Sequence, residues 1–146
     1  MWPDKEIMYV PGNHEFYRHE RMETLQQMRD CAQELRVHLL DNDEVVIAGV
    51  RFLGSTLWTD FKLFGEELKK SAMIEGGKYL NDFRLIHEHD RVFSPARSIQ
   101  LHKTSRAWLA AKLQAPFSGK TVFITHHLPS AQSVAERYKA STVNHK

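Results

Sequence analysis

The stretch IMYVPGNHEFY, residues 7–17, decides which fold this sequence predicts. Its apolar start has the length and composition of a short buried strand, and the Pro-Gly pair that follows is a turn that ends the strand. Asn13, His14 and Glu15 come directly after this turn. Polar side chains that follow a buried strand are expected to line a functional site, because loops at strand ends converge there.

A second apolar run, KTVFIT, also ends in polar residues, His126 and His127. An Asn amide oxygen and a His nitrogen suit divalent Mn, Fe or Zn ions. Ligands in layered α/β proteins gather at the carboxyl ends of strands, so we expect Asn13 and His126 to converge on a shared cation and His14 to face a substrate. The spacing alone also allows an ordinary turn and a surface pair of histidines.

The remainder of the chain alternates predicted helices and strands without a repeat or a linker, which predicts one domain over residues 1–146 of α/β or mixed α+β class. Apolar residues recur at steps of three and four over the two longest predicted helices, and Ser94 before Pro95 resembles an N-cap. GGKYLND at 76–82 predicts a loop. The predicted helices are 20–36, 95–113 and 131–140, and the predicted strands are 7–10, 37–40, 44–50, 51–57 and 120–125, with 44–57 as a hairpin.

Composition narrows the class of protein further. The 146 residues are 42% hydrophobic and 26% charged, with a net charge of +2 and no cluster of basic residues, so we expect no dedicated nucleic-acid partner. No apolar run approaches the roughly 18 residues that span a bilayer, and the start does not resemble a signal peptide, so we expect no membrane partner and a cytoplasmic location. The single cysteine, Cys31, excludes an internal disulfide.

VPGNHEFY together with VFITHHLPS resembles the calcineurin-like metallophosphoesterase superfamily, whose signature includes a Gly-Asn-His-Asp/Glu block and a later strand that ends in His. FLGSTLWTDF and LNDFR, which lie between them, resemble the cytoplasmic bacterial branch of that superfamily. The resemblance extends over residues 7–130. It implies two packed sheets flanked by helices and a hydrolase that cleaves a phosphoester with two divalent ions, Mn, Fe or Zn.

The resemblance also implies roles for five residues. Asn13 and His126 would bind metal, and His14 would be the catalytic residue that hydrogen-bonds the phosphoryl or leaving-group oxygen. Glu15 and His127 would orient these groups. Two cations would lower the pKa of a bridging water and neutralise the charge that develops during in-line attack, which suits a phosphoester substrate.

Three further motifs of that superfamily are absent from the sequence: an early Asp-x-His, a Gly-Asp-x-x-Asp and a late Gly-His-x-His. HEHD at 87–90 has a His-x-His but precedes the His126 block, and we interpret it as a solvated loop. The sequence therefore predicts a central fragment, a partial metallophosphoesterase-like β-sandwich that lacks its first and last strands, binds metal poorly and hydrolyses little by itself. The alternative is a non-enzymatic remnant whose exposed sheet edges make it a binding or self-associating assembly partner.

Overall fold

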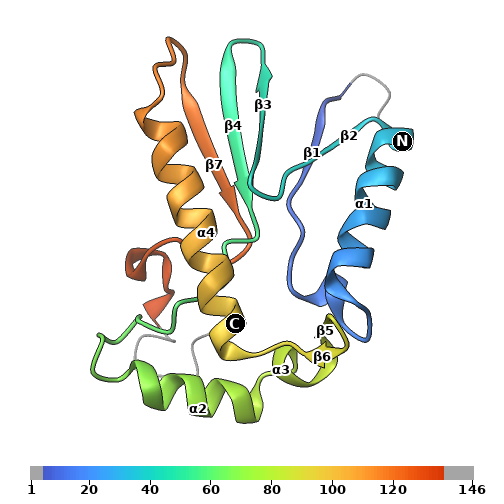
Figure 1. Cartoon of the computed structure of the whole chain (residues 1–146). Coiled ribbons are helices and arrows are strands. Elements are labelled where there is room, and N and C mark those ends of the chain that lie inside the picture. Colours follow the sequence, from blue (N-terminus) through green and yellow to red (C-terminus); the bar gives the residue numbers. More distant parts are fainter. Residues whose placement is uncertain (1–4, 137–146) are drawn as a thin grey trace.

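A computed structural model describes residues 5–136, which form a mixed α/β protein with four α-helices and three small sheets (Figure 1). Helices and strands interleave along the chain, as the sequence predicted. The elements are β1 (Ile7–Tyr9), η1 (His14–Phe16), α1 (Arg21–Leu35), β2 (Val37–Leu39), β3 (Asp43–Ile47), β4 (Val50–Ser55), α2 (Lys69–Tyr79), α3 (Asp82–Leu85), β5 (His87–Glu88), β6 (Arg91–Val92), α4 (Pro95–Gln114), β7 (Thr121–Thr125) and η2 (Ala131–Ser133).

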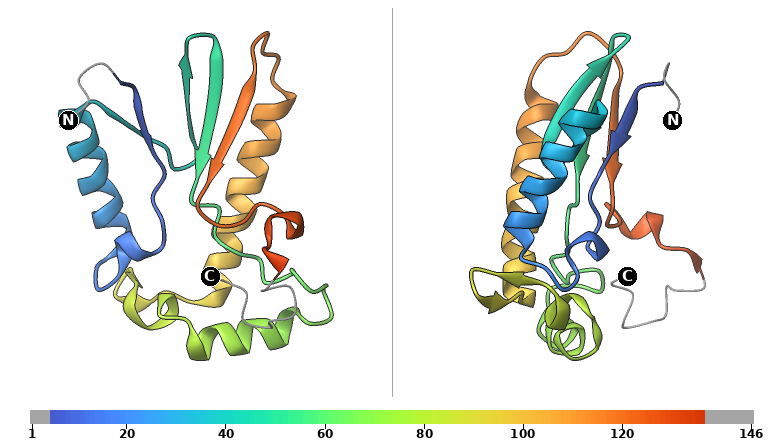
Figure 2. Two further views of the ribbon diagram at one scale, coloured as in Figure 1. Left: turned by 180° about the vertical axis from the view of Figure 1, so that it is seen from behind. Right: turned by 90° about the vertical axis from the view of Figure 1, so that its right-hand side faces the viewer.

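The two larger sheets lie in two arms of the molecule. β1 pairs in parallel with β2 beside α1, whereas β4 pairs antiparallel with β3 and in parallel with β7, with α4 alongside (Figures 1 and 2). The β3–β4 pair confirms the predicted hairpin. α2, α3 and the β5–β6 hairpin cross one end and connect the arms (Figure 2). None of the helices described between residues 5 and 136 has the length and apolar content needed to cross a bilayer.

The carboxyl ends of β1, β2 and β4 meet at a buried junction. The hydroxyl of Thr56, which is 1% exposed, donates a hydrogen bond of 2.8 Å to the carbonyl oxygen of Pro11. A Cβ at Gly54 would lie 2.2 Å from the Cβ of Leu40, far inside van der Waals contact. Glycine is therefore needed at this position for the end of β2 to approach β4 so closely.

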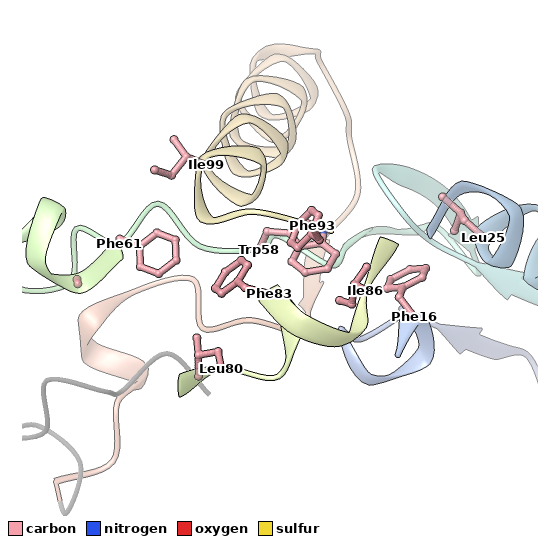
Figure 3. Packing of buried hydrophobic residues seen from close by; sticks show 10 residues of the cluster. Phe16, Leu25, Trp58, Phe61, Leu80, Phe83, Ile86, Phe93 and Ile99 are labelled. Atoms are coloured by element: carbon pink, nitrogen blue, oxygen red, sulfur yellow. The ribbon is translucent and has the colours of Figure 1, made fainter. Parts of the chain in front are cut away.

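The hydrophobic core lies beyond this junction, at the end of the molecule where the two arms are connected (Figure 3). Its aromatic rings pack against one another, for example Trp58 against Phe93 with ring centroids 4.6 Å apart. Burial of large aromatic side chains is the main favourable term available to a protein of this size. The buried members of the cluster are Phe16, Leu25, Trp58, Phe61, Ala72, Leu80, Phe83, Ile86, Phe93 and Ile99.

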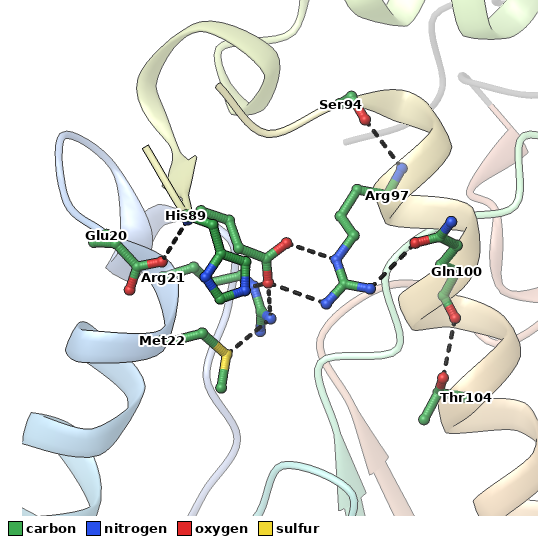
Figure 4. Close-up of polar contacts among 9 residues, drawn as sticks. Glu20, Arg21, Met22, His89, Ser94, Arg97, Gln100 and Thr104 are labelled. Atoms are coloured by element: carbon green, nitrogen blue, oxygen red, sulfur yellow. Dashed lines mark hydrogen bonds and ion pairs between the residues drawn. The ribbon is translucent and has the colours of Figure 1, made fainter. Parts of the chain in front are cut away.

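One buried carboxylate links the arms to the β5–β6 hairpin. Glu88 is 7% exposed and receives hydrogen bonds from Arg21 of α1, with Nε 3.0 Å from Oε1, and from Arg97 of α4, with Nε 2.5 Å from Oε2 (Figure 4). The interpretation of residues 87–90 as a solvated loop is therefore wrong at Glu88. No local pattern predicts that two arginines, 67 residues before Glu88 and 9 after it, converge on this side chain.

Four other expectations need correction. Gly76 and Gly77 lie inside α2 and not in a loop. Packing explains the glycine at position 76, because a Cβ there would meet the Phe61 ring at 2.8 Å. The residues of β1 and β7 are partly exposed, since each strand has a neighbour on one side only among the described residues. Of the predicted apolar stripe of α1, the two end residues, Met22 and Leu35, are exposed. The predicted helix at 131–140 is the short η2, and its last four positions lie outside the described residues.

We predict that Glu88→Ala lowers the free energy of unfolding by about 3–5 kcal/mol, because it leaves the buried Arg21 guanidinium without its counter-charge. Arg97→Ala should cost clearly less, since the Arg97 side chain is 37% exposed and water can replace part of its role. Urea denaturation at neutral pH measures both. Equal costs for the two variants would contradict this account of the ion pairs.

The same carboxylate should make stability depend on pH. Burial raises the pKa of Glu88, but hydrogen bonds from Arg97 and Arg21 outweigh it and hold the pKa at about 2, below its ordinary value of 4.5. A carboxyl with a lowered pKa in the folded state stabilises the protein fully above its unfolded pKa, and this contribution disappears as pH falls through the folded pKa. The stability difference between the wild type and Glu88→Gln should thus be constant above about pH 5 and shrink toward pH 2.

Candidate functional site

A cavity of about 540 Å³, here called the strand-end cavity, opens where the chain leaves β1 and β7. All five residues that the sequence singled out line it, although they come from segments more than 100 residues apart in the sequence. It also includes the end of α2 and the start of α3. The lining residues are Asn13, His14, Glu15, Tyr17, Tyr79, Leu80, Asn81, Asp82, His126 and His127.

Asn13 and His126 face each other directly in this cavity. His126 Nε2 is 2.9 Å from Asn13 Oδ1, across a separation of 113 residues. The backbone N–H of His126 donates to the carbonyl of Ser55 at 3.3 Å, so the β4–β7 pairing continues up to the site. This bond holds the backbone from which the His126 side chain extends. Two ligands on one tetrahedral ion at about 2.1 Å each lie about 3.4 Å apart, so these two atoms, joined here by a direct hydrogen bond of 2.9 Å, would have to separate only slightly to share a cation.

Asp82 fixes which way the Asn13 amide points. Its Oδ1 accepts hydrogen bonds from Asn13 Nδ2 at 2.7 Å and from the Tyr17 hydroxyl at 2.5 Å, and the Asp82 side chain is buried. A carboxylate only accepts, so the NH₂ of Asn13 must face Asp82 and the amide oxygen must face His126. Burial and then the hydrogen bond to Asp82 raise the pKa of Tyr17, so its hydroxyl remains a donor. The LNDFR stretch predicted no role for Asp82, because only the folded chain brings this side chain to Asn13.

Glu15 is held on the other side of the same loop. The Tyr9 hydroxyl donates to its carboxylate at 2.5 Å. Burial raises the pKa of Glu15, but hydrogen bonds from Tyr9 and from the backbone N–H groups of Glu15 and Gly12 outweigh it, so the pKa is lowered. Burial and the Glu15 hydrogen bond raise the pKa of Tyr9 to about 12. A Cβ at Gly12 would lie 2.6 Å from the His126 ring and 2.9 Å from the Glu15 carboxylate, which explains the glycine.

His127 and His14 differ in environment. His127 Nδ1 is 2.9 Å from the carbonyl of Thr56, so it carries the proton, and the ring packs on Trp58 with centroids 5.6 Å apart. Burial lowers the pKa of His127, which favours the neutral ring. His14 is exposed at the cavity wall and packs against Tyr17 with the two rings tilted and their centroids 4.5 Å apart. His14 is therefore accessible to a bound molecule, whereas His127 is fixed in the wall.

The donor set of this cavity is incomplete for a metal centre by itself. Asn13 and His126 supply two neighbouring ligand atoms of suitable chemistry, and a bound ion requires about four. Over the part of the chain that the structure describes, no three His, Cys, Asp or Glu side chains gather in a group that would hold a metal ion. The described residues thus fit one cation in part.

Comparison with known proteins adds little to this geometry. The chain is 29% identical over 136 residues to "Uncharacterized protein L509" of Acanthamoeba polyphaga mimivirus, and this match covers 85% of the chain and 45% of the viral protein. The chain thus spans about half the length of the curated relative that it matches. No family model and no solved structure matches the sequence.

We predict that Asp82→Asn releases the Asn13 amide, because an asparagine at 82 can donate as well as accept and no longer dictates which end of the amide faces His126. The expected result is a smaller fraction of the His126 ring protonated at Nε2, measured by ¹⁵N NMR of the imidazole. Tyr17→Phe is the matched control, since it removes one hydrogen bond to Asp82 and leaves the carboxylate in place. An unchanged His126 tautomer in Asp82→Asn would show that Asp82 does not orient the pair.

Proposed function

We propose that this protein is a metal-dependent phosphoesterase of the calcineurin-like type, which hydrolyses a phosphoester with a metal-activated water. The observation that carries the proposal is the 2.9 Å approach of His126 Nε2 to Asn13 Oδ1 in a cavity that also exposes His14. These are the three residues that the resemblance places in direct contact with metal or substrate. The proposal concerns the activity of a whole protein. The mimivirus relative is about twice as long as the region that matches this chain.

The sheets support a finer proposal about the fold. We propose that β1–β2 and β3–β4–β7 correspond to parts of the two sheets of a metallophosphoesterase-like sandwich. The segments that follow β1 and β7, one strand of each parallel pair, line one cavity, and α1 and α4 flank the pairs (Figure 1). A β-sandwich whose functional site lies at the ends of its strands requires strand ends that converge in this way.

Four residues of the cavity have a task in this proposal. Asn13 and His126 would hold one divalent ion, Mn, Fe or Zn, and a bound ion of this kind polarises phosphoryl oxygens and lowers the pKa of a bound water. Asp82 keeps the Asn13 oxygen aimed at that position. His14, exposed beside it, would donate a hydrogen bond or a proton to the oxygen that leaves. The neutral Asn13 ligand adds no negative charge that would repel a phosphate.

The experiment separates metal binding from catalysis. Titration calorimetry with Mn²⁺ should show that Asn13→Ala and His126→Ala each weaken binding at least about tenfold, whereas His14→Ala leaves it unchanged. Turnover of a generic phosphodiester with added Mn²⁺, even if slow, should fall by about 10²-fold or more in His14→Ala. Unchanged Mn²⁺ affinity in both ligand variants, or turnover that does not depend on His14, would overturn the proposal.

A second candidate function is favoured by the surface of β7. We propose, as the alternative, that the chain acts as an assembly partner through this strand. Val122 and Phe123 are 41% and 44% exposed, and β4 is the one strand that pairs with β7 among residues 5–136. An unpaired apolar strand edge is a template for pairing with another chain.

Light scattering after size-exclusion chromatography tests this alternative. If β7 drives self-association, the mass should rise with protein concentration and Phe123→Lys should return the protein to a monomer, because a charge in the middle of the strand opposes edge pairing. Leu35→Lys, at another exposed apolar position, the last residue of α1, is the control and should leave association intact. A monomer at every concentration would exclude self-association through this edge.

A further inference from the structure

A second cavity, of about 560 Å³, lies against α4 on the far side of His127, and we call it the α4 cavity. The loop after β4 and the segment after β7 form its other walls. His127 lines both this cavity and the strand-end cavity, so the two adjoin at one side chain. A volume of this size lies within the range of pockets that bind small organic molecules.

The α4 cavity combines apolar walls with a few polar groups that converge. Apolar side chains come from three segments, and this composition is typical of sites for organic ligands. Asp60 of the loop faces His102 of the helix, and Lys62 and Arg106 add two basic side chains to the lining. The main apolar contributors are Leu57, Leu63, Leu109, Leu113, Leu128 and Val134.

His102 is held in a fixed orientation. Its Nδ1 lies 3.0 Å from the carbonyl oxygen of Leu57 and 3.4 Å from that of Trp58, so Nδ1 carries the proton and donates. Leu57 and Trp58 have φ values of 67° and 49°, a left-handed conformation that bulky residues rarely adopt. The bond to His102 supports this strained turn, and it leaves Nε2 facing the cavity.

Asp60 faces His102 across a gap. Its Oδ1 accepts from the backbone N–H of Lys62 at 3.0 Å, while Oδ2 lies 3.8 Å from His102 Nε2, too far for a direct hydrogen bond. In the neutral ring Nε2 only accepts, as does the carboxylate. A carboxylate and an imidazole nitrogen that face one gap suit a ligand with adjacent hydroxyl groups, because a hydroxyl can donate to the carboxylate and can either donate to or accept from the ring nitrogen.

We propose that the α4 cavity binds the organic part of a phosphoester whose phosphate occupies the strand-end cavity, and that this organic part is a polyhydroxylated group with an apolar face, such as a nucleoside. This inference rests on the proposed function for the position of the phosphate. His127, packed on Trp58 and shared by the two cavities, would lie beside the bond between the phosphate and the organic part. Asp60 and His102 would receive the hydroxyl groups.

NMR with three probes tests the inference without relying on turnover. Adenosine should shift the His102 imidazole resonances, and 2′,3′-dideoxyadenosine, which lacks the ribose hydroxyls, should bind at least about tenfold more weakly. Adenosine 5′-monophosphate should shift both His102 and His126. Asp60→Asn retains the oxygen that accepts from Lys62, and should weaken adenosine but not inorganic phosphate.

The variants separate the two cavities. Lys103→Ala, on the exposed side of α4 next to His102, is the control and should change nothing. If adenosine shifts no His102 resonance, or if the dideoxy probe binds equally well, the inference is wrong even when Mn²⁺ binding and turnover behave as proposed. If adenosine binds as expected but Asn13→Ala does not weaken the monophosphate, the α4 cavity is a separate nucleoside site and the proposed phosphate position is wrong.

Discussion

The structure depends on the junction where the ends of β1, β2 and β4 meet. The Thr56 hydroxyl bonds the Pro11 carbonyl, and Gly54 lets Leu40 approach at a distance that any Cβ would prevent. Both contacts are buried, so their loss would leave an unsatisfied carbonyl or a backbone shift at the point that aims the loop after β1. Because β4 also carries β7, this junction brings Asn13 within hydrogen-bonding distance of His126. The strand-end cavity is thus a consequence of how closely the two arms approach.

The opposite end is held by a different kind of interaction. Glu88 accepts from Arg21 and Arg97 and so connects α1, the β5–β6 hairpin and α4 around the aromatic core (Figures 3 and 4). A buried carboxylate with two guanidinium partners is costly to remove, because its loss leaves the buried Arg21 guanidinium without a counter-charge. The same end of the molecule carries α3, whose first residue is Asp82. The ion pairs therefore stabilise the elements that supply the orienting carboxylate, while the junction positions the two side chains that it orients.

Local patterns in the sequence predicted most of the helices and strands, but they did not predict contacts between residues far apart in the chain. The α1 and α4 helices, the β3–β4 hairpin and the strand that precedes Asn13 all follow from periodicity, caps and turn residues. The placement of Asn13 and His126 at neighbouring strand ends followed from the general rule about strand termini. Asp82 and Glu88 were missed because a carboxylate in a short polar stretch gives no sign of which distant side chain it will contact. Gly76 was misjudged for the same reason, since its environment is set by Phe61 and not by its neighbours in sequence.

The central claim is that Asn13 and His126 form one site for a cation. Paramagnetic broadening by Mn²⁺, added well below one equivalent to ¹⁵N-labelled protein, tests it most directly. We expect the Asn13 side-chain amide and the His126 ring resonances to broaden first and together, while those of His102 and His19, which lie outside the strand-end cavity, remain sharp. Broadening that spares Asn13, or that reaches His126 only together with the other histidines, would contradict the account.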